Sequence, residues 1–437
     1  MSARRRSAIG PVSGVGIYFS SNGLVFAALL PWYPLLVERL GLSSWEFGLV
    51  VASFAVGAIA SSVLPARLIA RFGANAVVVG GTVLLGLSAA ATAWSTSGWM
   101  MALGLFLVGF FDAIVDVAQN VVGIAVQDSL GRVILSSMHA LWSLGGLLSG
   151  AAATFAASNG MDMRPYLGIV ALVAVGLVVI ARVLVGEAAA PRAGQDADGR
   201  GAAEGGSATD SDSVSGESSG ESSIGDDRAD SESAADSESA EGSRAPRRSK
   251  RIVLLTALPL AVVAVCGTAV EDIANNWSAI AAVQFSGIPI AAAGIAFSVV
   301  IGSQCLGRFS GDLFVQRFGP GAVARLGGGL IALGGLALVT AVEPIQLLVG
   351  LALMGYGSAT LVPGALSAAA HIPGAGRAGG VTLVNWIMRI GFLGTSPLVG
   401  VIATAGSLRW GLALLIVIGV LTMVFAGRLG AAFTKGR

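Results

Sequence analysis

Apolar runs long enough to cross a lipid bilayer recur along nearly the whole chain. A helix of about 20 apolar residues spans the hydrocarbon core of a membrane. Of the 437 residues, 54% are hydrophobic and only 12% are charged, whereas soluble domains carry roughly 25% charged residues. The sequence therefore predicts an all-α membrane protein with many spans. Its 62 glycines fit transmembrane helices whose backbones approach one another closely.

These apolar runs form two sets of six that are related by one offset. The first set lies near 15–38, 45–66, 74–95, 98–126, 133–157 and 165–186, and the second near 252–279, 288–314, 321–341, 343–369, 377–404 and 409–428. At an offset of 246 residues, Arg71 to Gly73 matches Arg317 to Gly319, and His139 matches Asn385. Duplicated halves are typical of transporter folds. We predict twelve transmembrane helices in two pseudo-symmetric bundles.

A segment of different composition separates the two sets of spans. From Asp196 to Glu241 the chain carries 14 acids and two arginines, with almost no bulky apolar residue. Such a segment cannot bury enough apolar surface to offset the entropy lost on ordering. We predict bundles at 1–186 and 251–437, joined by a disordered acidic linker at 187–250. A phosphorylated or partner-binding segment is the alternative for this linker.

The placement of lysine and arginine predicts the orientation of the chain, because cytoplasmic loops are enriched in these residues. With the N-terminus inside, the outer side receives only Arg39, Arg164 and Arg409. The inner side receives Arg4 to Arg6, Arg67, Arg71, Arg132, the cluster 247–251, Arg317, Arg325, Arg377 and the tail. We expect both termini in the cytoplasm and a first span that is retained rather than removed as a signal peptide.

Acidic side chains interrupt two of the spans. In GFFDAIVDVAQN, Asp112, Asp116 and Asn120 are spaced four apart and share one helix face. Glu271 and Asp272 lie in the seventh span. An ionised carboxylate at the bilayer centre costs about 2.5–3.5 kcal/mol on insertion scales. We therefore expect these acids to face a polar cavity, pair with a cation or stay protonated. A structural ion pair or interhelical hydrogen bond is the alternative for any one acid.

A cation and a histidine in other spans are candidate partners of these acids. Arg389 follows Asn385 by four residues in the eleventh span, and we predict that Arg389 pairs with Asp112 or Asp116. A structural ion pair between the halves is the alternative. His139, in SSMHALWSLGG, can form hydrogen bonds or titrate near neutrality, although a role in helix packing fits it as well.

Two tryptophans lie near the ends of spans. For Trp32 and Trp277 we favour the aromatic belt at the membrane interface, and a stacking platform for a sugar ring is the alternative. Asn275 shares a helix face with Glu271 in the seventh span, so it could reach the same cavity.

The sequence carries no sign of enzyme chemistry. No nucleophile–base pair, metal-ligand cluster or phosphate-binding loop is apparent. Cys266 and Cys305 lie in separate spans without metal-ligand spacing, and we interpret both as packing residues. We predict a protein that is not an enzyme, with no metal, no cofactor and no nucleic-acid partner.

The segment GRFSGDLFVQRFG, residues 307–319, resembles the signature loop of the major facilitator superfamily. The resemblance covers the chain outside the linker and implies a gating role for Arg308, Asp312 and Arg317, with ordinary positive-inside charge as the alternative. The first-half copy, PARLIARFG, keeps Arg71 but has alanine where an acid is expected.

Within that superfamily, the chain looks most like the bacterial fucose-permease-like branch. DVAQN is similar to the acid-x-Ala-x-Asn segment of fucose–proton symporters. That likeness implies proton coupling at Asp116 and sugar contact at Asn120. The first span departs from the branch because it carries no acid, and Asn22 is its only strongly polar residue. The resemblance implies a multi-pass protein of the bacterial inner membrane, which we expect to be a monomer.

The sequence thus predicts a proton-coupled transporter of a small polar, sugar-like solute that works by alternating access. Its proton-coupling candidates are Asp116, Asp112 and Glu271. Its substrate-binding candidates are Asn120, His139, Trp142, Asn385, Arg389, Asn275 and Asn22. Its gating candidates are Arg308, Asp312, Arg317 and Arg71. One alternative is a proton-driven exporter of drugs or metabolites, and another is a non-transporting sensor or assembly partner.

Overall fold

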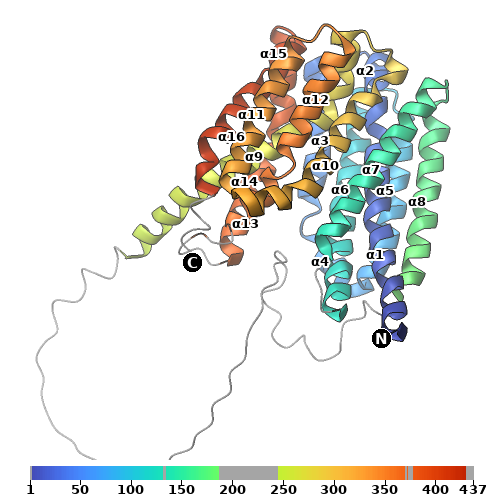
Figure 1. The fold of residues 1–437 in the computed structure, drawn as a ribbon. Coiled ribbons are helices and arrows are strands. Elements are labelled where there is room, and N and C mark those ends of the chain that lie inside the picture. Colours follow the sequence, from blue (N-terminus) through green and yellow to red (C-terminus); the bar gives the residue numbers. More distant parts are fainter. Residues whose placement is uncertain (1, 131–133, 187–244, 370–371, 373–376, 430–437) are drawn as a thin grey trace, which may run out of the picture.

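The computed structural model is helical throughout the part of the chain that it describes, which comprises residues 2–130, 134–186, 245–369, 372 and 377–429. The first half contains α1 (Ser2–Leu29), η1 (Leu30–Trp32), α2 (Tyr33–Leu40), α3 (Ser44–Ala60), α4 (Leu64–Phe72), α5 (Ala74–Thr92), α6 (Gly98–Leu130), α7 (Leu135–Ser158) and α8 (Met163–Val185). The second half contains α9 (Ala245–Ser286), η3 (Ile290–Ala292), α10 (Gly294–Phe318), α11 (Pro320–Val339), α12 (Pro344–Ser358), α13 (Leu361–Ala369), α14 (Arg377–Ala405), α15 (Leu408–Leu412) and α16 (Leu414–Phe425). Figure 1 shows these helices standing side by side.

The spans agree with the twelve that the sequence predicts. Among the described residues, 11 helices are long and apolar enough to cross a membrane, and α3 with α4 forms a twelfth, bent by 53°. The second span therefore differs from the single helix predicted near 45–66. Pro65 lies in the first turn of α4, where its missing N–H and ring fit a helix start, whereas in a helix interior they kink or break the helix.

The predicted duplication reappears in the backbone of the two halves. Gly73, between α4 and α5, has φ 79° and ψ 148°, and Gly319, between α10 and α11, has φ 81° and ψ 155°. These positive φ values favour glycine at both turns. The same offset relates the carbonyls that two arginines bind, because Arg39 donates to Ala93 and Ser95 and Arg409 donates to Val339 and Ala341. The arginines themselves are not related by this offset.

The bundle has two ends, which we name from the chain. The linker side is where α8 ends at Val185 and α9 begins, and the distal side is where α2 ends at Leu40 and α3 begins. Figure 1 shows the first helix starting at the linker side. The predicted linker at 187–250 falls almost wholly outside the described residues, since α9 starts at Ala245.

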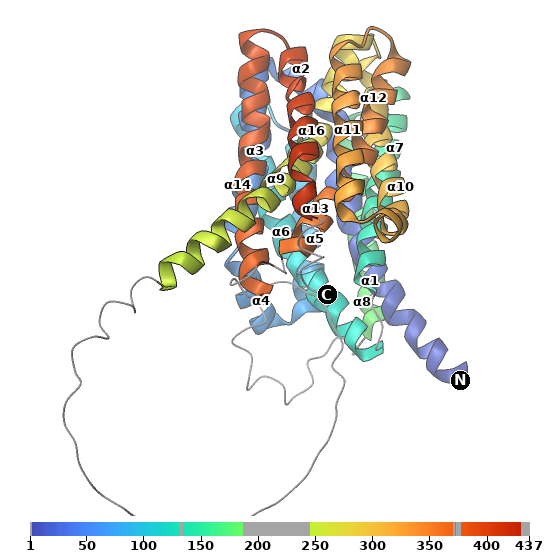
Figure 2. The same ribbon diagram turned by 60° about the vertical axis from the view of Figure 1, so that its left-hand side comes forward.

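The two halves meet mainly through two pairs of helices, α3 with α14 and α7 with α10, which can be followed in Figure 2. On the distal side, Gly48 of α3 lies against the backbone of Ser396, and Gly400 of α14 lies against that of Ser44. The backbone N–H of Trp45 donates to Thr404 Oγ1 at 3.0 Å. Glycine at these positions lets the two backbones approach, as small residues do between membrane helices.

Within the first half, the α3–α6 pair depends on a reciprocal glycine contact. A methyl group on Gly57 would overlap the carbonyl oxygen of Phe106, and one on Gly109 would overlap that of Phe54. Neither helix backbone can move away without disturbing its other neighbours, because packed interiors relax only in part.

We therefore predict that Gly57→Ala destabilises the bundle by about 1–3 kcal/mol, the usual cost of overpacking. Gly176→Ala is the matched control, because nothing lies within 4 Å of the methyl group that this substitution would add on α8. The control should be neutral or slightly stabilising, since alanine favours helices. Thermal unfolding of the detergent-purified variants measures both, and equal melting temperatures would contradict the expectation.

Candidate functional site

The Asn22 amide joins three helices of the first half near the middle of the bundle. Its Nδ2 donates to Asp112 Oδ1 at 2.9 Å, and its Oδ1 accepts from Trp142 Nε1 at 2.6 Å. Asn22 lies on α1, Asp112 on α6 and Trp142 on α7. The structure thus brings two predicted substrate-binding residues and one predicted proton-coupling residue into one hydrogen-bonded group.

Aromatic rings extend this group on one side. The ring centroids of Phe26 and Trp142 are 5.5 Å apart, and those of Phe26 and Phe54 are 5.7 Å apart. Such ring pairs form an apolar surface beside a small number of polar atoms. This combination is typical of small-molecule sites.

Asp116 lies one helical turn from Asp112 toward the linker side, and its side chain is exposed. Its Oδ1 accepts from Gln119 Nε2 at 3.3 Å and from Asn120 Nδ2 at 3.2 Å, both on the same helix. Asn120 Nδ2 also donates to the Asp116 carbonyl at 2.8 Å. The predicted stacking of Asp116 and Asn120 on one face of α6 is present.

His139 of α7 faces the same region. Its side chain interacts electrostatically with Asp116 and with Arg308, and its ring packs edge-on against Phe19 at a centroid distance of 5.1 Å. Asp116, His139 and Arg308 therefore belong to one electrostatic cluster, although they come from α6, α7 and α10.

Arg308 forms an ion pair within the second half and a hydrogen bond to the first half. Arg308 Nη2 donates to Glu271 Oε1 at 2.9 Å, and Arg308 Nη1 donates to Ser143 Oγ at 2.7 Å. Both charged side chains are 28% exposed, so water screens the pair only in part. Because Glu271 and Arg308 lie in the second half and Ser143 in the first, this group bridges the two halves.

The predicted partner of the acids was Arg389, and this pairing is not seen. Asp112 is held by Asn22, and in the described part of the chain the ion pair is that of Arg308 with Glu271. The reason is topological, because Arg308 lies on α10, which packs against α7, whereas α14 packs against α3 and α9. Arg389 and Asn385 on α14, and Asn275 on α9, are half-buried.

The predicted gating residues fall in different places. Arg71 and Arg317 are exposed on the linker side, each over the ring of its own neighbour, Phe72 or Phe318. Arg308 instead lies near the middle of the bundle with Glu271. Asp312 lies on α10, and its side chain is outside the described part of the chain. The structure therefore does not group the three described side chains, Arg71, Arg308 and Arg317, as a latch.

Trp32 and Trp277 do not form an aromatic belt, which corrects the prediction for both. They are 3% and 1% exposed, because they pack inside the protein rather than against lipid. The Trp277 ring lies edge-on to Phe47 of the first half, with centroids 5.1 Å apart, and Trp32 lies 5.7 Å from the ring of Tyr166.

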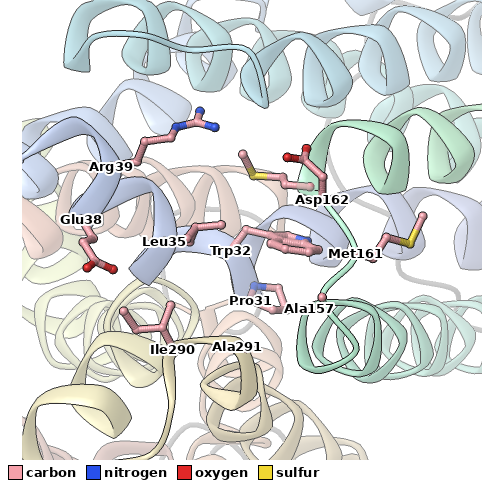
Figure 3. A pocket seen from close by; sticks show the side chains of 12 residues that line it. Pro31, Trp32, Leu35, Glu38, Arg39, Ala157, Met161, Asp162, Ile290 and Ala291 are labelled. Carbon is pink, nitrogen blue, oxygen red and sulfur yellow. The ribbon is translucent and has the colours of Figure 1, made fainter.

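A separate cavity of about 430 Å³ opens on the distal side, beside Trp32 (Figure 3). It lies between the end of the first span, the α7–α8 connection and η3. Two of its charged groups are already bound to backbone atoms, since Arg39 donates to two carbonyls and Asp162 Oδ1 accepts from the Arg164 N–H at 2.7 Å. The cavity is distinct from the group around Asn22.

Residues 15–344 match the Major Facilitator Superfamily. The chain belongs to this superfamily. It is a multi-pass membrane transporter, as the two-bundle fold and the family indicate together, and it is not an enzyme. An MFS-type transporter of Yersinia pestis is 23% identical over 396 residues, which cover 89% of this chain and 88% of that protein. A transporter of Sinorhizobium fredii is 29% identical over 146 residues, covering 33% of this chain and 39% of the relative.

Solved structures of transporters share the fold. The nucleoside transporter NupG is similar with a TM-score of 0.67 at 14% identity, covering 97% of this chain and 98% of NupG. A bacterial homologue of the human lysosomal transporter Spinster, in an inward-facing conformation, has a TM-score of 0.62 at 14% identity, covering 99% of this chain and 98% of the homologue. The resemblance to the fucose-permease-like branch stays a prediction.

We predict an energetic coupling of about 1 kcal/mol between Arg308 and Glu271, the upper end for partly exposed pairs. Arg308→Gln and Glu271→Gln should each lower stability, and the double variant should lose less than the sum. Thermal unfolding of wild type, both single variants and the double variant measures the coupling. Strict additivity would show that the two side chains do not interact in solution.

Proposed function

We propose that this superfamily member is a proton-coupled importer of a small polar, sugar-like solute. The observation that carries the proposal is the Asn22 amide, which bridges Asp112 and Trp142 beside the ring of Phe26. An amide, an indole N–H and a carboxyl can form hydrogen bonds with ring hydroxyls, and the aromatic surface can stack on the ring itself.

The proton site in this proposal is Asp116, with Asp112 beside it. The two acids interact electrostatically, and two carboxyls this close resist being ionised together. Among the described residues, the hydrogen-bond partners of Asp116 are amides of its own helix, so its charge can change without breaking contacts between helices. The Arg308 guanidinium provides positive potential in this cluster, which it shares with Asp116 through their common neighbour His139.

Arg308 links proton binding to the arrangement of the halves. Its guanidinium contacts Glu271 of its own half and Ser143 of the other half, next to His139 on α7. When Asp116 loses its proton, the new negative charge competes with Glu271 for the guanidinium. We propose that this competition favours one of the two arrangements of an alternating-access cycle.

We further propose that the linker side faces the cytoplasm. Arg71 and Arg317 are exposed on that side, and the superfamily match with bacterial relatives fits an inner membrane in which cytoplasmic loops carry the cations. The bundles 1–186 and 251–437 would then move as the two rocking units, with the acidic segment as their tether.

A proton-driven exporter is the second candidate function. The aromatic cluster of Phe26, Phe54 and Trp142 favours it, because ring surfaces also bind apolar compounds. Phe110 and Phe111 form a further ring pair with centroids 5.3 Å apart. Resistance to a toxic compound on overexpression, without solute-dependent proton uptake, would favour export.

The deciding experiment is proton flux in liposomes that hold the purified protein and a pH dye. L-fucose, other sugars and nucleosides are added one at a time, the last because NupG is a nucleoside transporter. We expect one class of compound to cause acidification inside the vesicles, which the enclosed dye reports. Silence across the panel, with folded protein, would move the assignment to the exporter.

Asp116→Asn should reduce that solute-driven proton flux at least about tenfold, because the amide cannot exchange a proton. Counterflow of labelled solute, which needs no net proton movement, should persist in the same variant. Asp128→Asn is the matched control. Asp128 is an exposed acid on the same helix, about three turns from Asp116. Wild-type flux in Asp116→Asn would exclude Asp116 as the proton site.

A further inference from the structure

Asp272 lies at the base of the contact that holds the halves together on the distal side. We call this contact the distal seal and define it by Phe47 and Gly48 of α3, Ser396 and Gly400 of α14, and Trp277 of α9. Gly48 lies against the backbone of Ser396, and Trp277 packs on Phe47. The seal therefore joins α3 of the first half to α9 and α14 of the second.

The Asp272 carboxyl is 4% exposed and is held entirely by neutral groups among the described residues. Its Oδ2 accepts from Ser396 Oγ at 2.5 Å, and its Oδ1 accepts from Asn276 Nδ2 at 2.8 Å. Trp277 Nε1 donates to the same Ser396 hydroxyl at 3.2 Å. The Ser396 hydroxyl thus joins Asp272 to Trp277, and both Ser396 and Trp277 belong to the distal seal.

The charged and titratable groups around Asp272 leave it without a counterion in the described part of the chain. Tyr33 of α2 is buried and interacts electrostatically with Asp272. The neighbouring Glu271 is paired with Arg308, and Glu46 of α3 is bound to Ser43 at the start of its helix. Arg389 of α14 precedes Ser396 by two helical turns and makes no ion pair with a described residue.

A buried carboxylate without a cation is unfavourable, because burial removes the water that would stabilise its charge. The closed seal accordingly favours the protonated acid. Separation of α3 from α14 would uncover the site and admit water, which favours the ionised acid.

We propose that Asp272 is a proton-binding site of the distal seal, distinct from the site at Asp116. It carries a proton while the seal is closed and gives that proton to water when the seal opens. Because the closed state then binds one more proton than the open state, closure is favoured as the pH falls. Loading of this site from the distal solution is thus a condition for the carrier to close on that side.

The test measures opening of the distal side directly as a function of pH. Spin labels are attached at Ser97→Cys and Val342→Cys, two exposed distal positions in opposite halves, after Cys266 and Cys305 are replaced by alanine. Pulsed electron–electron resonance on the full chain in lipid nanodiscs then gives the populations of short and long distances. One linked proton changes the closed-to-open ratio by up to about tenfold per pH unit.

We expect the short-distance population to rise as the pH falls in the otherwise unchanged protein. Asp272→Asn, whose amide stays neutral, should show the short distance at every pH. Glu38→Gln is the matched control, because Glu38 is an exposed distal acid outside the seal, and it should keep the response. A flat response in the parent protein, a retained response in Asp272→Asn, or a loss of the response in Glu38→Gln overturns the proposal.

Asp272→Glu keeps the test decisive if the asparagine variant does not fold. This variant retains a carboxyl but lengthens it, so its contacts with Ser396 and Asn276 change and the midpoint of the pH response should shift. A midpoint identical to that of the parent protein would place the responsible proton elsewhere. Solute-driven proton flux through Asp116 is not part of this measurement, so the two proposals can fail separately.

Discussion

A polar group that lies among membrane helices must find its partner inside the protein, and this constraint organises the middle of the bundle. Asn22 satisfies an acid of α6 and an indole of α7 with one amide. Arg308 satisfies an acid of its own half and a hydroxyl of the other half. Each of these side chains is therefore a structural tie between helices as well as a candidate for function.

The same constraint explains why the two sides of the bundle differ. On the distal side, glycine contacts and buried aromatic rings bring α3 against α14 and α9, and one uncharged network holds Asp272. On the linker side, Arg71 and Arg317 are exposed over their own phenylalanines. An alternating-access carrier must open the distal side and close the linker side in turn. The hydrogen bonds between the two halves must break and form again during that change, so their residues can control it.

Superfamily membership sets the architecture but leaves the substrate to the side chains. The solved transporters with the same fold are 14% identical to this chain, a level that shows the fold but not the substrate. The Asn22 group and the Arg308 bridge are therefore arguments from this chain alone. They support our proposal of a hydroxylated solute and of an Arg308 guanidinium for which Asp116 and Glu271 compete.

The amino-acid sequence by itself determined the spans, the duplication and the positions of the costly polar groups. Insertion in a membrane depends on the hydropathy of about 20 neighbouring residues, so local composition was sufficient for the twelve spans. The stacking of Asp116 with Asn120 was also predictable, because it depends on the helical repeat. Asp272 and Asn276 have the same four-residue spacing, so the sequence could have predicted their contact. Neither was among the predicted site residues.

Only the tertiary structure decided which polar groups meet. Asn22 and Asp112 are 90 residues apart in the sequence, and Arg308 and Ser143 are 165 residues apart. At such separations the spacing of two residues does not predict whether they are in contact. Arg389 was predicted to pair with Asp112 or Asp116 because it lies within a span. The packing of α10 against α7 brings Arg308 to the site instead. Trp32 and Trp277 are buried for the same reason, because helix packing, and not residue type, decides which face of a span meets lipid.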